Sequence, residues 1–273
     1  MFQYPGFNKV AFEIPLFGDF GPLKIHWYGI MYLVAFAAAW WLGRVRAGKP
    51  GSTWKPVDVD DFIFFGMLGT LIGGRLGYVF FYGLEYWTAK EWWYPIKVWD
   101  GGMSFHGGLL GVLIAFAIFA VRRKRRIADV FDFAAPLPGI GILAVRIGNF
   151  INAELWGKPT DVAWGFMYNG VVRHATQLYE AALEGALLFA ILWWYTSKPR
   201  PRLAPSGLFL VIYSLSRIIV EFWRLPDEHL GYLAGGWLTM GMLLSLPMLL
   251  VGLTLVFMAY RRRQPSGNFA LQT

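Results

Sequence analysis

The sequence contains no cysteine and few charged residues. Because Cys is absent from all 273 residues, disulfide bonds, thiolate metal sites and a cysteine nucleophile are excluded. Asp, Glu, Lys and Arg together make up only 15% of the chain. Histidine pairs at helical spacing, carboxylate-rich loops and nucleotide-binding motifs are also missing, so we expect no metal and no cofactor. Any chemistry must therefore use Arg, His, Tyr, Asn and Glu.

Hydrophobic residues, in contrast, account for 56% of the chain and fall in blocks of roughly 20 residues, long enough to cross a bilayer. Six such blocks lie at 25–42, 62–82, 103–121, 178–197, 206–222 and 237–260. A seventh segment, 129–145, contains Asp129, Asp132 and two prolines, so hydropathy alone does not distinguish a span from a re-entrant segment. The pattern predicts an all-α integral membrane protein.

The basic residues predict how the chain is threaded. Lys and Arg gather at 44–55, 122–126, 198–202 and 261–263. Such clusters mark cytoplasmic loops, and the second and third share a side only if 129–145 also crosses the membrane. We therefore expect about seven transmembrane helices in one domain, 1–263, with a small non-cytoplasmic cap at 149–177 and a loose cytoplasmic tail at 264–273.

Two further expectations follow from the charge pattern and the N-terminal residues. The net charge is +8, but the cations lie in short loops rather than on one basic face, which argues against nucleic acid as a partner. The first 24 residues lack the features of a cleaved signal peptide. The first span is therefore expected to act as its own insertion signal.

Three arginines lie inside or at the edge of apolar blocks: Arg75, Arg146 and Arg217. An arginine near the bilayer centre costs roughly 2.5–3.5 kcal/mol on insertion scales, so it persists where it meets a partner charge, a bundle interior or an anionic ligand. Glu180, Glu184 and Glu221 are the candidate partners.

Polar residues in the second half of the chain form three groups at helical spacing. The groups are Tyr213, Arg217, Glu221 and Arg224; Gln177, Glu180 and Glu184; and Arg146, Asn149, Asn152 and Glu154. One polar cavity near the outer leaflet would explain all three. The alternative is an internal Arg217–Glu221 ion pair that only tightens packing.

Segment 139–157 contains four glycines around Arg146. Its backbone could approach an anion and offer N–H donors, or the glycines could serve helix packing. A guanidinium binds phosphate through a rigid fork, which suits Arg146 to a phospholipid headgroup. His106, with two glycines on each side, is either structural or open to a ligand, whose thiol proton it could accept. Tyr28 could donate to a phosphate or carbonyl oxygen.

The segment VRIGNFINAELWG at 145–157 resembles the signature of the prolipoprotein diacylglyceryl transferase family. Further segments resemble that family in the same order: HWYGIMY at 26–32, GGRLGYVFFY at 73–82, DGGMSFHGGLLG at 100–111, QLYEA at 177–181 and YSLSRIIVEFWRLPD at 213–227. The resemblance covers nearly the whole chain. One departure, Ala-Thr at 175–176 where the family has Pro and Ser, concerns the shape of the cap.

The resemblance implies an enzyme and its site. In that reaction, the sulfur of a prolipoprotein's lipobox cysteine displaces glycerol phosphate from phosphatidylglycerol and forms a diacylglyceryl thioether, the first step of bacterial lipoprotein maturation. Arg146, Arg217 and Gly157 would bind the headgroup, with Tyr28, His106, Asn149, Glu154, Tyr213 and Glu221 around the reacting centre. His106 is the candidate base for the thiol.

The implied partners are phosphatidylglycerol, a prolipoprotein signal peptide with its lipobox cysteine, and membrane lipids. The implied location is the bacterial cytoplasmic (inner) membrane, with a periplasmic N-terminus and a cytoplasmic C-terminus. From the residues alone, a multi-span lipid-binding or transport protein with an anionic-headgroup site remains the alternative, although the sequence has no internal repeat.

Overall fold

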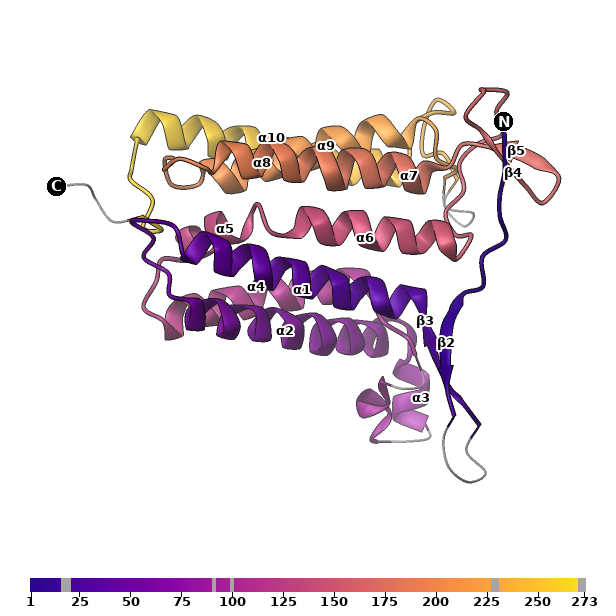
Figure 1. Ribbon diagram of the computed structural model, residues 1–273, viewed down its shortest axis with the longest axis horizontal. Helices are drawn as coiled ribbons and strands as arrows, with labels where there is room; N and C mark the ends of the chain where they lie inside the picture. Colours follow the sequence, from indigo (N-terminus) through magenta and orange to yellow (C-terminus); the bar gives the residue numbers. More distant parts are fainter. Residues whose placement is uncertain (16–20, 90–91, 99–100, 227–230, 270–273) are drawn as a thin grey trace. The chain divides into compact units, whose positions relative to one another are not determined.

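The computed structural model describes residues 1–15, 21–89, 92–98, 101–226 and 231–269 (Figure 1). The chain forms two compact units, Met1–Trp41 with Asp132–Ser266 and Leu42–Phe131 with Gly267–Thr273. Helix α1 (Trp27–Ala47) contributes to both units. The two units are described separately below.

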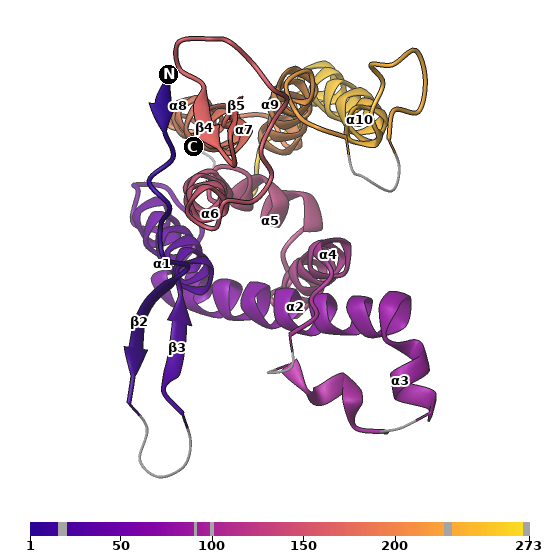
Figure 2. The same cartoon turned by 90° about the vertical axis from the view of Figure 1, so that its right-hand side faces the viewer.

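The first unit contains most of the candidate site. Its strands are β1 (Phe2–Gln3), β2 (Val10–Ile14), β3 (Leu23–His26), β4 (Phe166–Tyr168) and β5 (Val171–Arg173). Its helices after α1 are α6 (Pro138–Ile151), α7 (Thr176–Glu180), the π-helical segment Ala181–Leu187, α8 (Leu188–Tyr195), α9 (Ala204–Glu221) and α10 (Met240–Arg262). Figure 2 shows α9 beside α10, a contact made close by Gly207 and Gly252.

Two small sheets accompany these helices. Strands β2 and β3 form an antiparallel pair, while β4 pairs with β5 and with β1 (Figure 1). The β4–β5 loop is Asn169-Gly170, and both residues have positive φ, 48° and 78°. Asn-Gly is the preferred pair for a two-residue hairpin turn that needs this conformation. The hairpin lies within the segment predicted to be a cap.

The second unit is built on α2 (Pro56–Tyr82) and α4 (Phe105–Arg122), with α3 (Leu84–Ala89) after α2. Helices α2 and α4 approach each other through glycines, because a Cβ added to Gly77 would lie 2.7 Å from the Cα of Gly107. Small residues at this spacing are typical of helix contacts within membranes. Ser104 caps α4 by accepting a hydrogen bond from the Gly107 N–H at 3.2 Å.

The predicted fold class is confirmed, since the structure is mainly helical and six described helices are long and apolar enough to cross a membrane. These candidates are α1, α2, α4, the continuous helix Thr176–Tyr195, α9 and α10. A seventh is possible by length and composition if α5 (Ile127–Ala134) and α6 count as one span bent by 51°. The protein is thus a multi-pass membrane protein.

Prolines explain the break between α5 and α6. Pro136 lacks the N–H that would continue α5, and Pro138 occupies the first turn of α6, where no N–H is needed. Asp132, one of the charges that weakened this segment in the sequence, accepts from the Leu203 N–H at 2.7 Å and the Ser206 N–H at 3.1 Å. It therefore caps the N-terminus of α9 from another helix.

Part of the tail predicted to be loose is hydrogen-bonded. The Gly267 N–H donates to the Asp129 carboxylate at 2.9 Å, and Asn268 is buried, accepting from Trp54 Nε1 at 2.8 Å. The expectation of a loose tail is therefore wrong for these two residues, because they pair with polar groups of α5 and of the segment before α2.

Candidate active site

Helix α6 approaches the helix Thr176–Tyr195 very closely. The approach depends on Gly185 in the π-helical segment, since an added Cβ would lie 2.8 Å from the Cα of Leu143 on α6. π-Helical turns within α-helices are rare and occur often at functional sites. This contact allows polar side chains of the two helices to meet.

Two glutamates on the Thr176–Tyr195 helix are completely buried, and both contact Arg146 of α6. Arg146 Nη1 lies 3.2 Å from Glu180 Oε2, and Nη2 lies 3.0 Å from Glu184 Oε2. A carboxylate taken out of water costs several kcal/mol unless it is paired and hydrogen-bonded. The arginine supplies that pairing.

Two more arginines come from α9 and from the residues just after it. Arg217 Nη1 lies 2.5 Å from Glu180 Oε1, and its Nη2 lies 3.2 Å from Glu221 Oε2. Arg224, just after α9, places Nη1 2.8 Å from Glu180 Oε1 and Nε 3.4 Å from Glu221 Oε2. Glu180 therefore contacts three guanidinium groups.

We call Arg146, Glu180, Glu184, Arg217, Glu221 and Arg224 the buried ionic network. Its three carboxylates and three guanidinium groups cancel in charge when all are ionised. The side chains of Arg146 and Arg217 remain 19% and 18% exposed, against 0% for Glu180. An anion arriving from outside would therefore meet guanidinium groups first.

The turn after α6 presents Glu154 from a strained backbone. Ala153 and Leu155 have φ angles of 58° and 59°, a left-handed conformation that is uncommon for residues with a Cβ. The Glu154 carboxylate accepts hydrogen bonds from Nδ2 of Asn149 at 3.1 Å and from Nδ2 of Asn152 at 3.3 Å. These three polar residues, expected to act together, are thus joined.

The same turn is tied to the helix that carries Glu180. The Gln177 side-chain amide donates to the Glu154 carbonyl, and the Thr176 hydroxyl donates to the Leu155 carbonyl at 2.8 Å. Gln177 and Thr176 are both fully buried. All three polar groups identified in the sequence are therefore connected, by ion pairs or by hydrogen bonds through the backbone.

Gly157 packs where a larger residue does not fit. An added Cβ would lie 2.6 Å from the carbonyl oxygen of Trp223 and 2.7 Å from Cγ2 of Thr176. Its N–H donates to the His174 carbonyl at 2.8 Å, and its backbone bridges to Arg224. Gly157 therefore has a packing role next to the buried ionic network that does not depend on a ligand.

His174, which the sequence did not single out, belongs to a chain of hydrogen bonds. Its Nδ1 lies 3.0 Å from the Tyr179 hydroxyl, which accepts from Trp164 Nε1 at 2.8 Å. Burial, with a smaller effect of nearby Lys158, lowers the pKa of His174 from its ordinary value. A neutral ring with Nδ1 unprotonated can accept a hydrogen bond from the Tyr179 hydroxyl.

The two tyrosines predicted for the site lie near the charged groups. The Tyr213 hydroxyl interacts electrostatically with Glu184 and Arg146. Tyr28, on the first turn of α1, interacts electrostatically with Glu154 and Arg146. Both hydroxyls therefore lie within electrostatic range of Arg146.

His106 lies in the second unit, exposed on the first turn of α4. His106 and the buried ionic network therefore belong to different units. Of the four glycines that flank His106, Gly107 packs α4 against α2, whereas Gly101 has no atom within 4 Å of an added Cβ and Gly108 only ordinary contacts. The His106 ring is exposed, and its role as the base stays a prediction.

Segment 139–157 was expected either to offer backbone N–H donors to an anion or to pack helices, and its part 139–151 does the second. This part is helix α6, so apart from its first turn its N–H groups are used within the helix. Its glycines allow close packing, because a Cβ on Gly141 would lie 2.9 Å from the Cβ of Ala35. The alternative interpretation, helix packing, is the correct one here.

Arg75 is stabilised without a carboxylate among the described residues. It is 2% exposed and donates to the carbonyls of Tyr94 at 2.8 Å, Gly101 at 2.5 Å and Gly102 at 3.2 Å. Its guanidinium carbon lies 4.8 Å from the centre of the Tyr94 ring. Arg75 thus anchors the loop after α3 within the second unit.

Comparison with known proteins identifies the family. The family model for prolipoprotein diacylglyceryl transferase matches residues 15–258. The chain belongs to this family. Relatives from Oleidesulfovibrio alaskensis and Solidesulfovibrio magneticus are 51% and 52% identical over 273 residues, covering 98% of this chain and 98% and 99% of theirs. A relative from Coxiella burnetii is 50% identical over 270 residues, covering 97% of this chain and 100% of its own. All three are named phosphatidylglycerol–prolipoprotein diacylglyceryl transferase.

The predicted prolipoprotein diacylglyceryl transferase family and the transferase class are thus confirmed. Sequence reasoning gave too little weight to Glu180 and Arg224, which it noted as polar neighbours but did not place in the site. The available signal was the spacing of Gln177, Glu180 and Glu184, which sets three polar groups on one face of an apolar helix.

Proposed function

We propose that this chain transfers the diacylglyceryl group of phosphatidylglycerol to the cysteine thiol of a prolipoprotein, the first step of lipoprotein maturation. The family membership supports this reaction, as do the names of relatives 51% and 52% identical to the chain. The structural observation that carries the proposal is the convergence of Arg146 and Arg217, from two helices, on Glu180 and Glu184.

In the proposed complex, Arg146 and Arg217 hold the lipid phosphate. A guanidinium offers two parallel N–H donors to a phosphate, and Glu180 behind both residues limits their motion. Because the network is neutral as a whole, the anion is held by short hydrogen bonds from the exposed edges of the two guanidinium groups rather than by long-range attraction. Pre-oriented donors of this kind lose little entropy on binding.

The proposed reaction forms a C–S bond and breaks a C–O bond. The cysteine sulfur attacks the glyceryl carbon that carries the phosphate, and the electron pair of the broken bond leaves on the phosphate oxygen as glycerol phosphate. Negative charge therefore grows on the phosphate, so guanidinium groups stabilise the transition state more than the bound lipid.

The thiol must lose its proton in this step. A free thiol has a pKa near ~8.5, so transfer to a neutral imidazole costs little near neutral pH, and His106 is the proposed base. The remaining proposed site residues, which would shape the reacting centre, are Tyr28, Asn149, Glu154, Gly157, Tyr213 and Glu221.

The proposal is tested with purified protein, phosphatidylglycerol vesicles and a lipobox peptide, by measuring peptide mass. The expected product is heavier by one diacylglyceryl group. R146K and R217K keep the charge but lose the fork, so we expect turnover to fall by about 10²-fold or more. R44Q, which removes a half-exposed ion pair with Asp60, is the control and should retain activity. Unmodified peptide with bound lipid would favour transport or lipid binding instead.

We further propose a location in the bacterial inner membrane, with 1–263 as one membrane domain, a periplasmic N-terminus and 149–177 as a cap on that side. The basic clusters support a cytoplasmic C-terminus. The cysteine-free chain allows a direct test with single cysteines. D161C should react with an impermeant maleimide in intact cells, whereas R261C should react only after permeabilisation.

A further inference from the structure

A partly open cavity of about 350 Å³ lies beside the β4–β5 hairpin and the end of α9, within the first unit. Its polar and aromatic walls are Trp156, Tyr168, Asn169, Arg173 and Arg224, and its other walls are apolar. None of the described residues that line it is acidic. Within the described part of its lining, the cavity therefore carries two guanidinium groups and no carboxylate.

Arg224 connects this cavity to the buried ionic network. Its Nη1 and Nε face Glu180 and Glu221, at 2.8 Å and 3.4 Å. The third nitrogen of the Arg224 guanidinium, Nη2, takes part in neither of these ion pairs with described carboxylates. The same side chain thus contacts Glu180, the shared partner of Arg146 and Arg217, and forms part of the cavity wall.

Arg173 lies on β5, the second strand of the hairpin, and is held in place by its neighbours. Its Nη1 donates to the Gly157 carbonyl at 3.3 Å, and its backbone pairs with Phe166 and bridges to Pro159. In the described part of the chain, the Arg173 side chain forms no ion pair with Asp or Glu. A guanidinium placed next to a cavity without a carboxylate partner is suited to an external anion.

We infer that this cavity binds the free glycerol phosphate as it leaves the reacting centre, an inference that rests on the proposed transfer reaction. Once the C–O bond breaks, the phosphate changes from a diester with one negative charge to a monoester that can carry two. The added charge strengthens its attraction to Arg224 and Arg173, whereas the intact lipid is retained by its acyl chains in the bilayer.

The size and composition of the cavity fit this ligand. Glycerol phosphate is water-soluble and cannot leave through hydrocarbon, so it needs a polar route. The cavity is of the size of ordinary small-molecule sites, roughly 300–1,000 Å³. Asn169 can hydrogen-bond a glycerol hydroxyl, and Trp156 and Tyr168 provide a flat wall for the carbon chain.

The test measures product inhibition of the transfer reaction by added glycerol 1-phosphate, with inorganic phosphate in a parallel series. In R173Q we expect the inhibition constant to rise about tenfold or more, because a charge-assisted hydrogen bond is lost. R173K, which keeps the charge without the fork, should show a smaller rise. Initial turnover without added product, and the KM for phosphatidylglycerol, should stay within about twofold of wild type.

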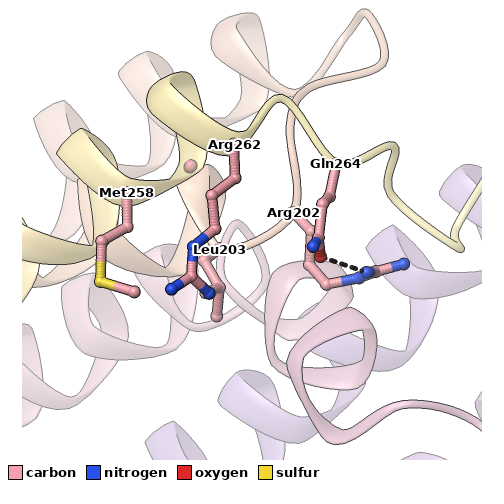
Figure 3. A pocket seen from close by; sticks show the side chains of 6 residues that line it. Arg202, Leu203, Met258, Arg262 and Gln264 are labelled. Atoms are coloured by element: carbon pink, nitrogen blue, oxygen red, sulfur yellow. Dashed lines mark hydrogen bonds between the residues drawn. The ribbon is translucent and has the colours of Figure 1, made fainter.

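R202Q is the matched control. Arg202 also lines a cavity, but that cavity is only about 30 Å³, too small for a phosphate ester, and the side chain already donates to Gln264 Oε1 at 3.0 Å (Figure 3). Its inhibition constant should equal that of wild type.

Three outcomes would overturn the inference. An unchanged inhibition constant in R173Q would show that the cavity does not bind the product. A matching rise in the KM for phosphatidylglycerol would assign Arg173 to the lipid headgroup, and a rise confined to the KM for the peptide would assign the cavity to the protein substrate. If the wild type forms no modified peptide at all, the proposed function fails first, and that result is distinct from these three.

Discussion

Replacing Glu180 by Gln should destabilise the protein strongly, because this residue contacts three guanidinium groups. Its Oε1 lies 2.5 Å from Arg217 and 2.8 Å from Arg224, and its Oε2 lies 3.2 Å from Arg146. Gln keeps the shape and one acceptor oxygen, but its NH₂ group faces at least one arginine without a lone pair to offer. The buried ionic network would then carry a net charge of +1.

The expected loss of unfolding free energy follows from the burial of the ion pairs that Glu180 forms. Glu180 is 0% exposed, so solvent does not screen the loss. Removing one partner of a buried ion pair costs about 3–5 kcal/mol, since the remaining charge stays buried and unpaired. An anion bound by the arginines replaces part of the missing charge, so the loss should be smaller in mixed micelles of phosphatidylglycerol and a neutral detergent than in the neutral detergent alone.

The assay measures the free energy of unfolding of wild type and E180Q by denaturant titration. Each protein is measured in the neutral detergent with and without phosphatidylglycerol. E13Q is the control, because Glu13 pairs with Lys24 at 3.9 Å and both side chains are about half exposed. An exposed pair contributes about 0–1 kcal/mol. If E180Q unfolds with the same free energy as E13Q, the three arginines do not depend on Glu180 and the account of the network is wrong. An equal loss with and without phosphatidylglycerol would argue against anion binding by these arginines.

Three further changes have distinct expected results. G157A should lose about 1–3 kcal/mol of unfolding free energy and most of its activity, because the new methyl group would lie 2.6 Å from the Trp223 carbonyl oxygen, while G29A, with no atom within 4 Å, should be neutral. H106Q should reduce turnover by about 10²-fold or more without changing lipid binding; near-normal turnover would remove His106 as the base. The pKa of His174 is lower in the folded chain than its ordinary value of 6.5, so between these two values the unfolded chain binds a proton at this residue and the folded chain does not. The contribution of His174 to stability is therefore present above pH 6.5 and is lost as the pH falls toward the lowered pKa. Unfolding measured from pH 5 to 8 should therefore show a smaller pH dependence in H174Q than in wild type, and equal slopes would contradict the assignment.

The sequence alone predicted where polar chemistry would be found. Arg146, Arg217 and Glu221 stand out because apolar blocks of membrane length rarely contain a charge without a partner or ligand. Helical spacing then grouped them with Asn149 and Glu154. These inferences need only the local period of the helix and the cost of a charge in hydrocarbon, so they survive without any knowledge of tertiary contacts.

Other features depended on tertiary contacts. The sequence offered several carboxylates as partners for each arginine. The close approach of α6 at Gly185 lets Glu180 contact three arginines, which the sequence did not predict. Arg75 found backbone carbonyls instead of an acid. Of the two roles open to the glycines of 139–157, contact with an anion or helix packing, Gly139, Gly141 and Gly148 serve helix packing.

The amino-acid sequence by itself therefore predicted the membrane class, the six long apolar helices and the residue types of the buried ionic network, because hydrophobic length, helical period and charge are properties of the chain. The tertiary structure decided which charges pair, why Gly157 and Gly185 must be small, and where a cavity lies next to Arg224. The physical reason is that ion pairing and close packing depend on the rotation and separation of helices, which are set by contacts between residues far apart in the chain.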